Sequence, residues 1–517
     1  MKERLLALSA VAFLVVGACG QEPASTSTQP QGEGTSTVPS STVTGEEGPR
    51  TDLIVGLGGE PPTIDMTASA SSLIPVVLLY NVLEPLVKIG ADGSINPLLA
   101  ERWDISEDGM TYTFHLREAM FHDGEPLTAD DVKFTLDRAA DPVTGHPFGW
   151  HFEIVDSVTA TDDRTVVVEL NRPSNIFLYR LGLRSGAIYP ERSVNALANH
   201  PIGTGPFRFV EWQQGTGIDL ERNDSYWGEP AFLEQVSFRY YAERDGSVNA
   251  LLAGDVDLLP NLLVPPRINE FQNPSFVIKE LPSTELVWVG INHDTELLQD
   301  VRIRQAMSLA IDREASIAAL GGYRVLGGPH VPPTDPWVLL DTPINDYDPD
   351  RARSLLAEAG YPDGIDVTIR VPGTPKLPPV AELIASQWAE VGIRVTLQVD
   401  ELAVWYAEVQ DPARAEFEVT VISDEEPRGI HLFQDEDNYN NYYNQELDDL
   451  LTAADAALTS EEQIRQYQAA QELLAEELPF IWLWVNTEIP IMKSGLTGYT
   501  SARIDVSTDL VSVRWEG

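Results

Sequence analysis

Cysteine is almost absent from this sequence, because its 517 residues contain only Cys19. A single cysteine excludes an internal disulfide, and a cysteine-based zinc site would need a second chain. Basic residues are also scarce: 34 Lys and Arg stand against 80 Asp and Glu, a formal net charge of −46. A polyanion repels phosphate backbones, which excludes nucleic acid as a partner. The acidic excess is interpreted as a solvated surface, and it also favours cationic or amino-bearing solutes.

Catalytic and nucleotide-binding motifs are missing as well. The sequence has no G-x-S-x-G elbow, no G-x-x-x-x-G-K-[ST] phosphate loop and no H-E-x-x-H zinc helix. Gly56, Gly58 and Gly59 follow a predicted strand but lack the third glycine of the dinucleotide fingerprint, so they are interpreted as a turn. No metal site and no cofactor is predicted, and the weight moves from catalysis to binding.

No apolar run is long enough to form a transmembrane helix, which needs roughly 20 residues. The run at 5–16 follows two basic residues and ends in Val16-Gly17-Ala18-Cys19, the pattern of a secretory signal, so residues 1–18 are predicted to be a signal peptide. Residues 19–50 consist mainly of small and polar residues that bury too little surface to fold, which predicts a disordered tether. The motif that ends at Cys19 resembles the bacterial lipobox, which implies that Cys19 becomes lipidated.

From Thr51 onward the patterns of strands and helices are interspersed, which predicts an α/β fold. Apolar runs and period-two alternation predict strands at 53–57, 111–116 and 165–170. Helices are predicted where N-capping residues precede a helical pattern, at Thr128 before 129–138 and at Asp348 before 349–359. A helix end, a glycine turn and a strand are predicted over 387–397, and a further polar helix over 461–477.

Seven stretches in sequence order carry a family resemblance. They are Tyr80–Val87, Leu99–Trp103 with Asp108–Arg117, Phe121–Val132, Gly203–Phe207, Leu220–Gly228, Val301–Arg313, and Tyr347–Pro349 with Leu355–Pro362. In this order the chain resembles the family 5 extracellular solute-binding proteins, the oligopeptide, dipeptide and nickel-binding group of bacterial ABC importers. The resemblance covers about residues 51–490.

The resemblance implies a two-lobed fold of the periplasmic-binding-protein type, with a hinge and an inserted subdomain. Lobe I is expected at 51–82, 203–288 and 485–517, the insertion at 83–202 and lobe II at 289–484. It also implies a monomeric receptor, lipid-anchored through Cys19 at the extracytoplasmic face of the cell membrane. That receptor closes on a solute, most readily an oligopeptide, and delivers it to the permease of an ABC transporter. An intracellular ATPase drives the transport, so this chain is expected not to be an enzyme.

The resemblance also supplies candidate ligand-binding residues. Peptide-binding relatives carry an aspartate near the end of lobe II that pairs with a peptide's α-ammonium, and Asp424 takes this place here, without the aromatic residue that usually precedes it. Charge-assisted bonds of this kind are strong and directional. The alternative reading of Asp424 is one more surface acid. The other candidates are Trp405, Tyr406, Asn441 and Tyr442, expected on loops, and the turn Gly203, Thr204 and Gly205, which is alternatively a purely structural feature.

Two classes of function remain open. The favoured one is the solute receptor, with a nickel chelate or an oligosaccharide as alternatives to a peptide. The other is a secreted enzyme or a ligand sensor built on the same fold, because a fold alone does not determine function.

Replacement of Cys19 tests the predicted lipid anchor. Cys19→Ala removes the thiol that would carry the lipid, so the protein is expected to move from the membrane pellet to the soluble fraction on cell fractionation. A variant that stays in the membrane pellet would show that the lipobox interpretation is wrong.

Overall fold

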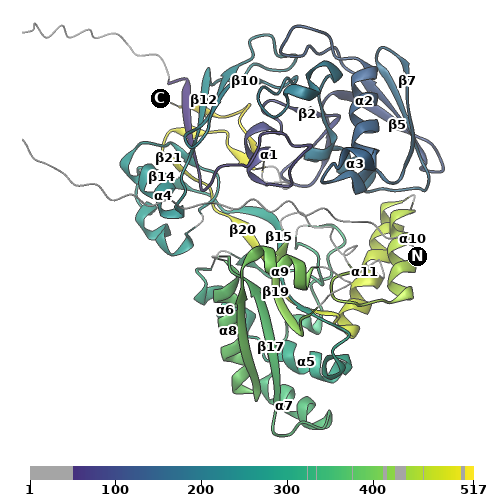
Figure 1. Ribbon diagram of the computed structural model, residues 1–517, viewed down its shortest axis with the longest axis vertical. Coiled ribbons are helices and arrows are strands. Elements are labelled where there is room, and N and C mark those ends of the chain that lie inside the picture. Colours follow the sequence, from purple (N-terminus) through teal and green to yellow (C-terminus); the bar gives the residue numbers. More distant parts are fainter. Residues whose placement is uncertain are drawn as a thin grey trace, which may run out of the picture. The chain divides into compact units, whose positions relative to one another are not determined.

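The computed structural model describes residues 50–516, apart from 263, 323, 334, 375, 411–415, 425–432, 434–437, 458 and 502–506. Cys19, the predicted signal peptide and the predicted tether up to residue 49 lie outside these described residues. No helix in the described part is long and apolar enough to cross a membrane. Strands and helices are mixed throughout, as expected for an α/β protein (Figure 1).

A seven-stranded mixed sheet collects strands from distant parts of the chain (Figure 1). Its order is β10 (Phe207–Gln213), β11 (Gly217–Arg222), β12 (Gln235–Tyr240), β1 (Asp52–Leu57), β13 (Leu258–Leu259), β21 (Ile491–Lys493) and β14 (Phe276–Ile278). The central strand β1 runs parallel to β12 and β13. Its residues Leu53 and Val55 are buried in the core of this sheet, because parallel central strands are covered on both faces. The outer strands of the sheet pair antiparallel: β10 with β11, β11 with β12, β13 with β21, and β21 with β14.

A four-stranded antiparallel sheet lies between β1 and β10 in the sequence. Its order is β5 (Ala100–Ile105), β6 (Thr111–Leu116), β8 (Thr165–Leu170) and β7 (Val155–Asp162). The alternating residues Tyr112, Phe114 and Leu116 point into a separate core, with α2 (Ala129–Ala140) and α3 (Phe177–Leu181) packed against it. Two two-stranded pairs accompany it, β2 (Glu84–Pro85) with β9 (Ala187–Ile188) and β3 (Val87–Ile89) with β4 (Ile95–Pro97).

The third large sheet has six strands, in the order β16 (Arg324–Val325), β20 (Phe480–Glu488), β15 (Leu281–Ile291), β19 (Val419–Asp424), β17 (Ile365–Pro372) and β18 (Ile393–Asp400). Strand β15 in its interior is apolar on both faces. Val287 and Val289 of β15 belong to the core that includes α5, α7 and α8, whereas Leu286 and Trp288 belong to the core that includes α9, α10 and α11. The sheet is therefore the middle layer of three.

The helices of this third part are α5 (Val301–Leu309), α6 (Arg313–Ala319), α7 (Pro349–Glu358), α8 (Leu377–Glu390), α9 (Leu402–Val409), α10 (Gln445–Asp455) and α11 (Ser460–Glu477). Elsewhere lie α1 (Leu73–Leu78) and α4 (Arg244–Ala253), and near the C-terminus the pairs β22 (Leu496–Thr497) with β25 (Arg514–Trp515) and β23 (Thr500–Ser501) with β24 (Thr508–Asp509). Short 3₁₀ helices occupy Pro142–Thr144, Gly149–Phe152, Arg184–Gly186, Glu191–Ala196, Pro265–Phe271, Glu296–Gln299 and Pro343–Asn345.

The local predictions are confirmed. Thr128 and Asp131 form a reciprocal capping box at the start of α2, and the Asp348 carboxylate accepts a hydrogen bond from the Arg351 amide at the start of α7. Gly360 follows the end of α7 and has a φ of 99°, and Gly392 turns the chain between α8 and β18 with a φ of 92°. The predicted strands at 53–57, 111–116 and 165–170 are β1, β6 and β8.

Two antiparallel strands, β15 and β20, connect the seven-stranded and six-stranded parts (Figure 1). Leu281, at the start of β15, packs against the core of the seven-stranded sheet, and Leu286 lies in a core of the six-stranded sheet. These strands cross the expected lobe boundaries at 288 and 485. The assignment of the ranges to lobes that move separately stays a prediction.

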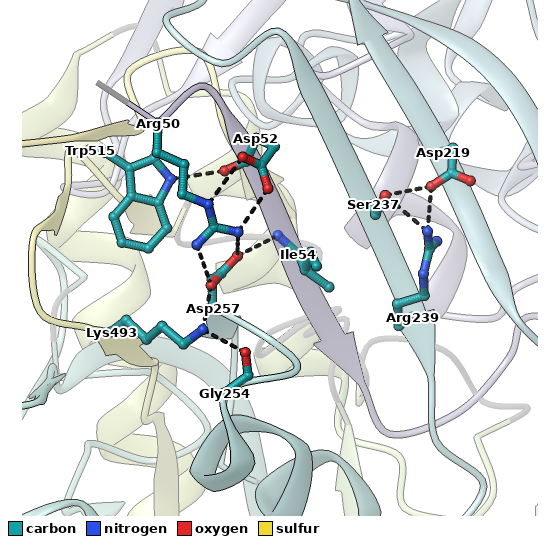
Figure 2. A network of polar contacts seen from close by, with 10 residues as sticks. All are labelled: Arg50, Asp52, Ile54, Asp219, Ser237, Arg239, Gly254, Asp257, Lys493 and Trp515. Atoms are coloured by element: carbon teal, nitrogen blue, oxygen red, sulfur yellow. Dashed lines mark hydrogen bonds and ion pairs between the residues drawn. The ribbon is translucent and has the colours of Figure 1, made fainter. Parts of the chain in front are cut away.

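A buried aspartate joins three strands of the seven-stranded sheet (Figure 2). The Asp257 side chain is 1% exposed and accepts hydrogen bonds from the Arg50 guanidinium at 2.7 Å to each oxygen. It also accepts from Lys493 Nζ at 2.8 Å and from the Ile54 amide at 2.9 Å. The carboxylate thus fixes the start of β1 and the end of β21 beside β13, and every charge around it is compensated.

The loss of the Asp257 carboxylate should destabilise the protein strongly. Asp257→Ala is expected to lower the free energy of unfolding by about 3 kcal/mol, because two cations and a backbone amide lose their common acceptor. The matched control is Asp219→Ala on β11. Asp219 contacts Ser237 and Arg239 but keeps 27% of its side chain exposed, so its loss should cost about 1 kcal/mol or less (Figure 2). Urea unfolding measures both, and equal losses would contradict this account.

Candidate functional site

Asp424 is the last residue of β19, the strand between β15 and β17. The register places it beside Leu286 of β15, close to the point where β15 enters the six-stranded sheet. The alternating residues Val421 and Ile422 before it are buried on opposite faces of the sheet, which holds the end of the strand in place. The Asp424 side chain and residues 425–432 lie outside the described part of the structure.

Four polar residues, called here the Glu285 cluster, lie at and around Glu285, the residue before Leu286. They are Glu285, Lys376, Ser423 and Asn486. Glu285 of β15 is 8% exposed, and its carboxylate accepts hydrogen bonds from Lys376 Nζ at 3.0 and 3.2 Å. The side chains of Ser423 on β19 and Asn486 on β20 also act on this carboxylate, because both lower its pKa. Three neighbouring strands and the segment before α8 therefore meet at one carboxylate.

The cluster keeps this carboxylate ionised. Burial raises the pKa of Glu285, but the Lys376 ammonium and the hydrogen bonds from Asn486 and Ser423 outweigh burial, so its pKa lies below the ordinary value. A second cation, Arg324 of β16, is attracted by Glu285. Its guanidinium lies 5.7 Å from the centre of the Trp484 ring. Burial lowers the pKa of Arg324.

The charged groups of this region are chemically suited to ionic contacts. Lys376 keeps 34% of its side chain exposed, while the carboxylate it neutralises is buried. Ammonium and guanidinium groups beside carboxylates form strong charge-assisted hydrogen bonds with charged ends of a small molecule. In the described residues no group of three or more His, Cys, Asp or Glu is placed to hold a metal ion. Sequence reasoning missed Glu285 and Lys376, since nothing in either local sequence distinguishes them from surface charges.

The turn Gly203–Gly205 is buried against the chain at 81–84. A Cβ on Gly203 would lie 1.9 Å from the Val82 carbonyl oxygen, and one on Gly205 would lie 2.3 Å from the Asn81 carbonyl oxygen. Both positions therefore require glycine. Thr204 is fully buried and donates from its hydroxyl to Glu84 Oε2 at 2.8 Å. The structure gives the turn a packing role, and ligand contact by Gly203, Thr204 and Gly205 stays a prediction.

Glu84 explains why several of the family motifs meet. Its buried carboxylate accepts hydrogen bonds from Thr204, from the Tyr226 hydroxyl at 2.7 Å and from Trp227 Nε1 at 2.9 Å. Burial raises the pKa of Glu84, and the three donors only partly oppose it. Parts of three of the stretches that carry the resemblance thus form one structural network that fixes β2.

The expectation that Trp405 and Tyr406 lie on loops is wrong, because both belong to α9. A helix turns neighbouring side chains by about 100°, which sends the two in different directions. Trp405 is 3% exposed, and its Nε1 donates to Thr420 Oγ1 at 3.1 Å, so it is part of a core. Tyr406 is 57% exposed. Thr420 lies four residues before Asp424 along β19, roughly 13 Å away.

Asn441 and Tyr442 lie near the far end of β15. Asn441, with a φ of 54°, donates from Nδ2 to Asn292 Oδ1 at 3.2 Å and to Asp294 Oδ2 at 3.1 Å. Tyr442 is 5% exposed and packs on His293, and burial raises the pKa of its hydroxyl to about 12. Seven residues of extended chain separate Asn292 from Glu285, roughly 24 Å. The structure therefore does not bring these two residues together with the Glu285 cluster.

Known proteins place the chain in a family. The family described as bacterial extracellular solute-binding proteins, family 5 Middle, matches residues 94–422. The chain belongs to this family, as the sequence motifs predicted. Heme-binding protein A of Haemophilus influenzae is 28% identical over 474 residues, which cover 82% of this chain and 84% of that protein. The dipeptide-binding protein of Escherichia coli K12 is 28% identical over 478 residues, covering 84% and 88%.

A solved structure confirms the fold class. The ABC transporter-associated periplasmic binding protein DppA from Helicobacter pylori, in complex with the peptide STSA, has a TM-score of 0.75 to this structure. It is 25% identical, and the match covers 91% of this chain and 99% of that one. The α/β fold is therefore that of the periplasmic binding proteins.

The Lys376–Glu285 ion pair makes stability depend on pH in a predictable direction. Glu285 has a lowered pKa in the folded state, so its contribution is present above the ordinary value near 4.5 and is lost as the pH falls through the folded pKa. Lys376→Met leaves the buried carboxylate without its cation. We expect a loss of unfolding free energy at pH 7 that shrinks at pH 4, measured by urea unfolding.

The matched control is Lys133→Met in α2. Lys133 pairs with Asp137 at 2.5 Å, but both side chains are more than 40% exposed, so its removal should change stability little at either pH. A Lys376→Met cost that is the same at pH 4 and pH 7 would contradict the assigned role of Glu285.

Proposed function

We propose that this chain is a lipid-anchored, extracytoplasmic receptor that captures an oligopeptide by hinge closure and delivers it to an ABC transporter permease. One observation carries the proposal. A cluster of opposite charges, Glu285 with Lys376 and Arg324, lies beside the end of β19 at Asp424, next to the two strands that connect separately packed sheets. A solute held there contacts the region about which the two parts would rotate.

The hinge is assigned to β15 and β20. Changes in φ and ψ over a few residues of a linking segment can rotate one packed body relative to another. The regular register of this pair is interrupted between residues 282 and 286. A solute that binds the closed form better than the open form shifts the population toward closure. A permease can distinguish the two forms by their different surfaces.

Peptide is the favoured solute because its two ends carry opposite charges. Asp424 is assigned to the α-ammonium, and Lys376 and Arg324 lie near enough to Glu285 to provide positive potential for a carboxylate. The names of the relatives support a solute receptor, since one binds dipeptide and a structural relative holds a four-residue peptide. Another relative is named for heme, which keeps non-peptide solutes as the alternative.

The remaining parts of the proposal follow from this role. The receptor would act as a monomer without a cofactor, and the energy for transport would come from the ATPase of its transporter rather than from catalysis by this chain. Cys19 would carry the lipid, and the tether up to residue 50 would let the folded part reach the permease.

Native mass spectrometry of the purified protein tests the solute class. A series of bound species whose masses differ by amino-acid residues would support a peptide receptor. One sharp adduct of another composition would show that the solute is not a peptide mixture. When no adduct co-purifies, a thermal-shift screen with short peptides decides, because a ligand that binds only the folded state raises its melting temperature.

Asp424 is tested with a peptide and its blocked form. Trialanine is expected to bind the parent protein more tightly than N-acetyl-trialanine, because acetylation removes the ammonium. Asp424→Ala should weaken trialanine binding by about 2 kcal/mol or more and abolish the difference between the two peptides. Isothermal titration calorimetry measures both. Asp366→Ala is the control, since Asp366 lies on β17 of the same sheet with 78% of its side chain exposed and pairs with Arg394. Unchanged discrimination in Asp424→Ala would remove the assignment.

A further inference from the structure

The C-terminal end of α10 is bound by a residue from the four-stranded part of the molecule. Asn175, two residues before α3, donates from Nδ2 to the Ala454 carbonyl oxygen at 2.8 Å and from its backbone amide to the Asp455 carbonyl oxygen at 3.2 Å. The two segments are 279 residues apart in the sequence. The last carbonyl groups of a helix have no partner within the helix, so a donor from outside satisfies them.

Both sides of this contact are held by their own cores. Phe177 and Leu181 of α3 are fully buried in the core of the four-stranded sheet, and Leu451 and Ala454 of α10 are fully buried in a core of the six-stranded sheet. The covalent connection between these cores runs through β15 and β20. The contact at Asn175 is therefore a second, non-covalent connection between parts that the linking strands would allow to separate.

The charges across the contact are complementary. The C-terminal end of a helix carries a partial negative charge, to which the Asp455 carboxylate adds a full one. Asp455 is fixed by the Tyr467 hydroxyl of α11 at 3.0 Å. The Asp455 charge attracts Arg180 of α3. Burial lowers the pKa of Arg180 and the attraction of Asp455 opposes this, while Arg172 contributes a further positive charge nearby.

Arg180 has contacts within its own part of the chain. Its guanidinium lies 5.2 Å from the centre of the Trp150 ring and donates to the His151 carbonyl oxygen at 3.5 Å. The cation is thus held in place before the two parts meet. A preorganised cation costs less conformational entropy on contact than a free arginine side chain.

We infer that Asn175 and Arg180 form a latch that closes on the end of α10 and stabilises the closed arrangement of the two parts. The latch is separate from the Glu285 cluster. It sets how often the protein closes in the absence of solute, and a change in that population changes the apparent affinity for any solute without changing a ligand contact. Solute affinity and intrinsic closure are then adjustable by different residues.

Distances between two spin labels measure the latch directly in the protein without solute. Cys19 is the only cysteine, so Cys19→Ser in the full chain permits labelling at Val143→Cys and Asp350→Cys. These positions, in the four-stranded part and at the start of α7, are 90% and 94% exposed. Double electron–electron resonance spectroscopy gives the distance distribution between the two labels in each variant.

Asn175→Asp replaces a donor by a negative charge facing the end of α10 and Asp455. We expect its distances to shift to longer values, with the open-to-closed ratio raised about tenfold or more, because two hydrogen bonds are lost or opposed by repulsion. Asn175→Ala, which adds no charge, should shift the distribution in the same direction by less. It also serves as the test if Asn175→Asp does not fold.

Asn171→Asp is the matched control. Asn171 makes the same kind of bond, from Nδ2 to the Glu153 carbonyl oxygen at 2.9 Å, but within the four-stranded part. Its distances should superpose on those of the parent. Superposable distributions for the parent, Asn175→Asp and Asn175→Ala would overturn the latch. No solute enters the measurement, so its result is independent of whether the protein binds peptide.

Discussion

The antiparallel pairing of β15 with β20 is the constraint on which the rest of this structure depends. The two strands leave the seven-stranded part and enter the centre of the six-stranded sheet, where they are apolar on both faces. Burial on both sides holds these strands in place, because each face packs against its own core. Residues on these strands and at their edges, such as Glu285 and Asn486, therefore occupy well-defined positions although they belong to a connection.

Three buried carboxylates differ in the donors that surround them. Glu84 receives only neutral donors and has a raised pKa, whereas Glu285 receives similar neutral donors together with the Lys376 ammonium and has a lowered pKa. Asp257 is neutralised by two cations at the junction of β1, β13 and β21. In a chain with a net charge of −46, the few basic residues at these places have a large effect, because an uncompensated buried charge is costly.

The connection between parts also distinguishes the proposed site from the proposed latch. Glu285 and Asn486 of the Glu285 cluster lie on the linking strands β15 and β20, which the proposal assigns to the hinge. Asn175 contacts the end of α10, and the cores on the two sides of that contact are separate. Solute recognition and closure are thus assigned to different residues of the fold, and relatives with different named ligands can share one scaffold.

Much of the fold was predictable from the sequence. Period-two alternation located β6 and β8, and N-capping residues located the starts of α2 and α7, since these signals act over a few neighbouring residues. The ordered motifs also identified the family. Asp424 was assigned to the ligand by resemblance, and that assignment stays a prediction; the structure places its backbone at the end of β19. Trp405 and Tyr406 were wrongly expected on a loop; both lie on the short helix α9, where Trp405 is buried and Tyr406 is exposed.

What the sequence by itself determined is the family, the α/β class and the local elements, because hydrophobic periodicity, capping and ordered motifs are written in contiguous residues. Only the tertiary structure decided which distant residues meet. It brought Lys376, Ser423 and Asn486 to Glu285, Thr204 and Trp227 to Glu84, and Asn175 to Ala454. Each meeting depends on sheet order and strand register, which arise from packing across hundreds of residues and leave no mark in the local sequence.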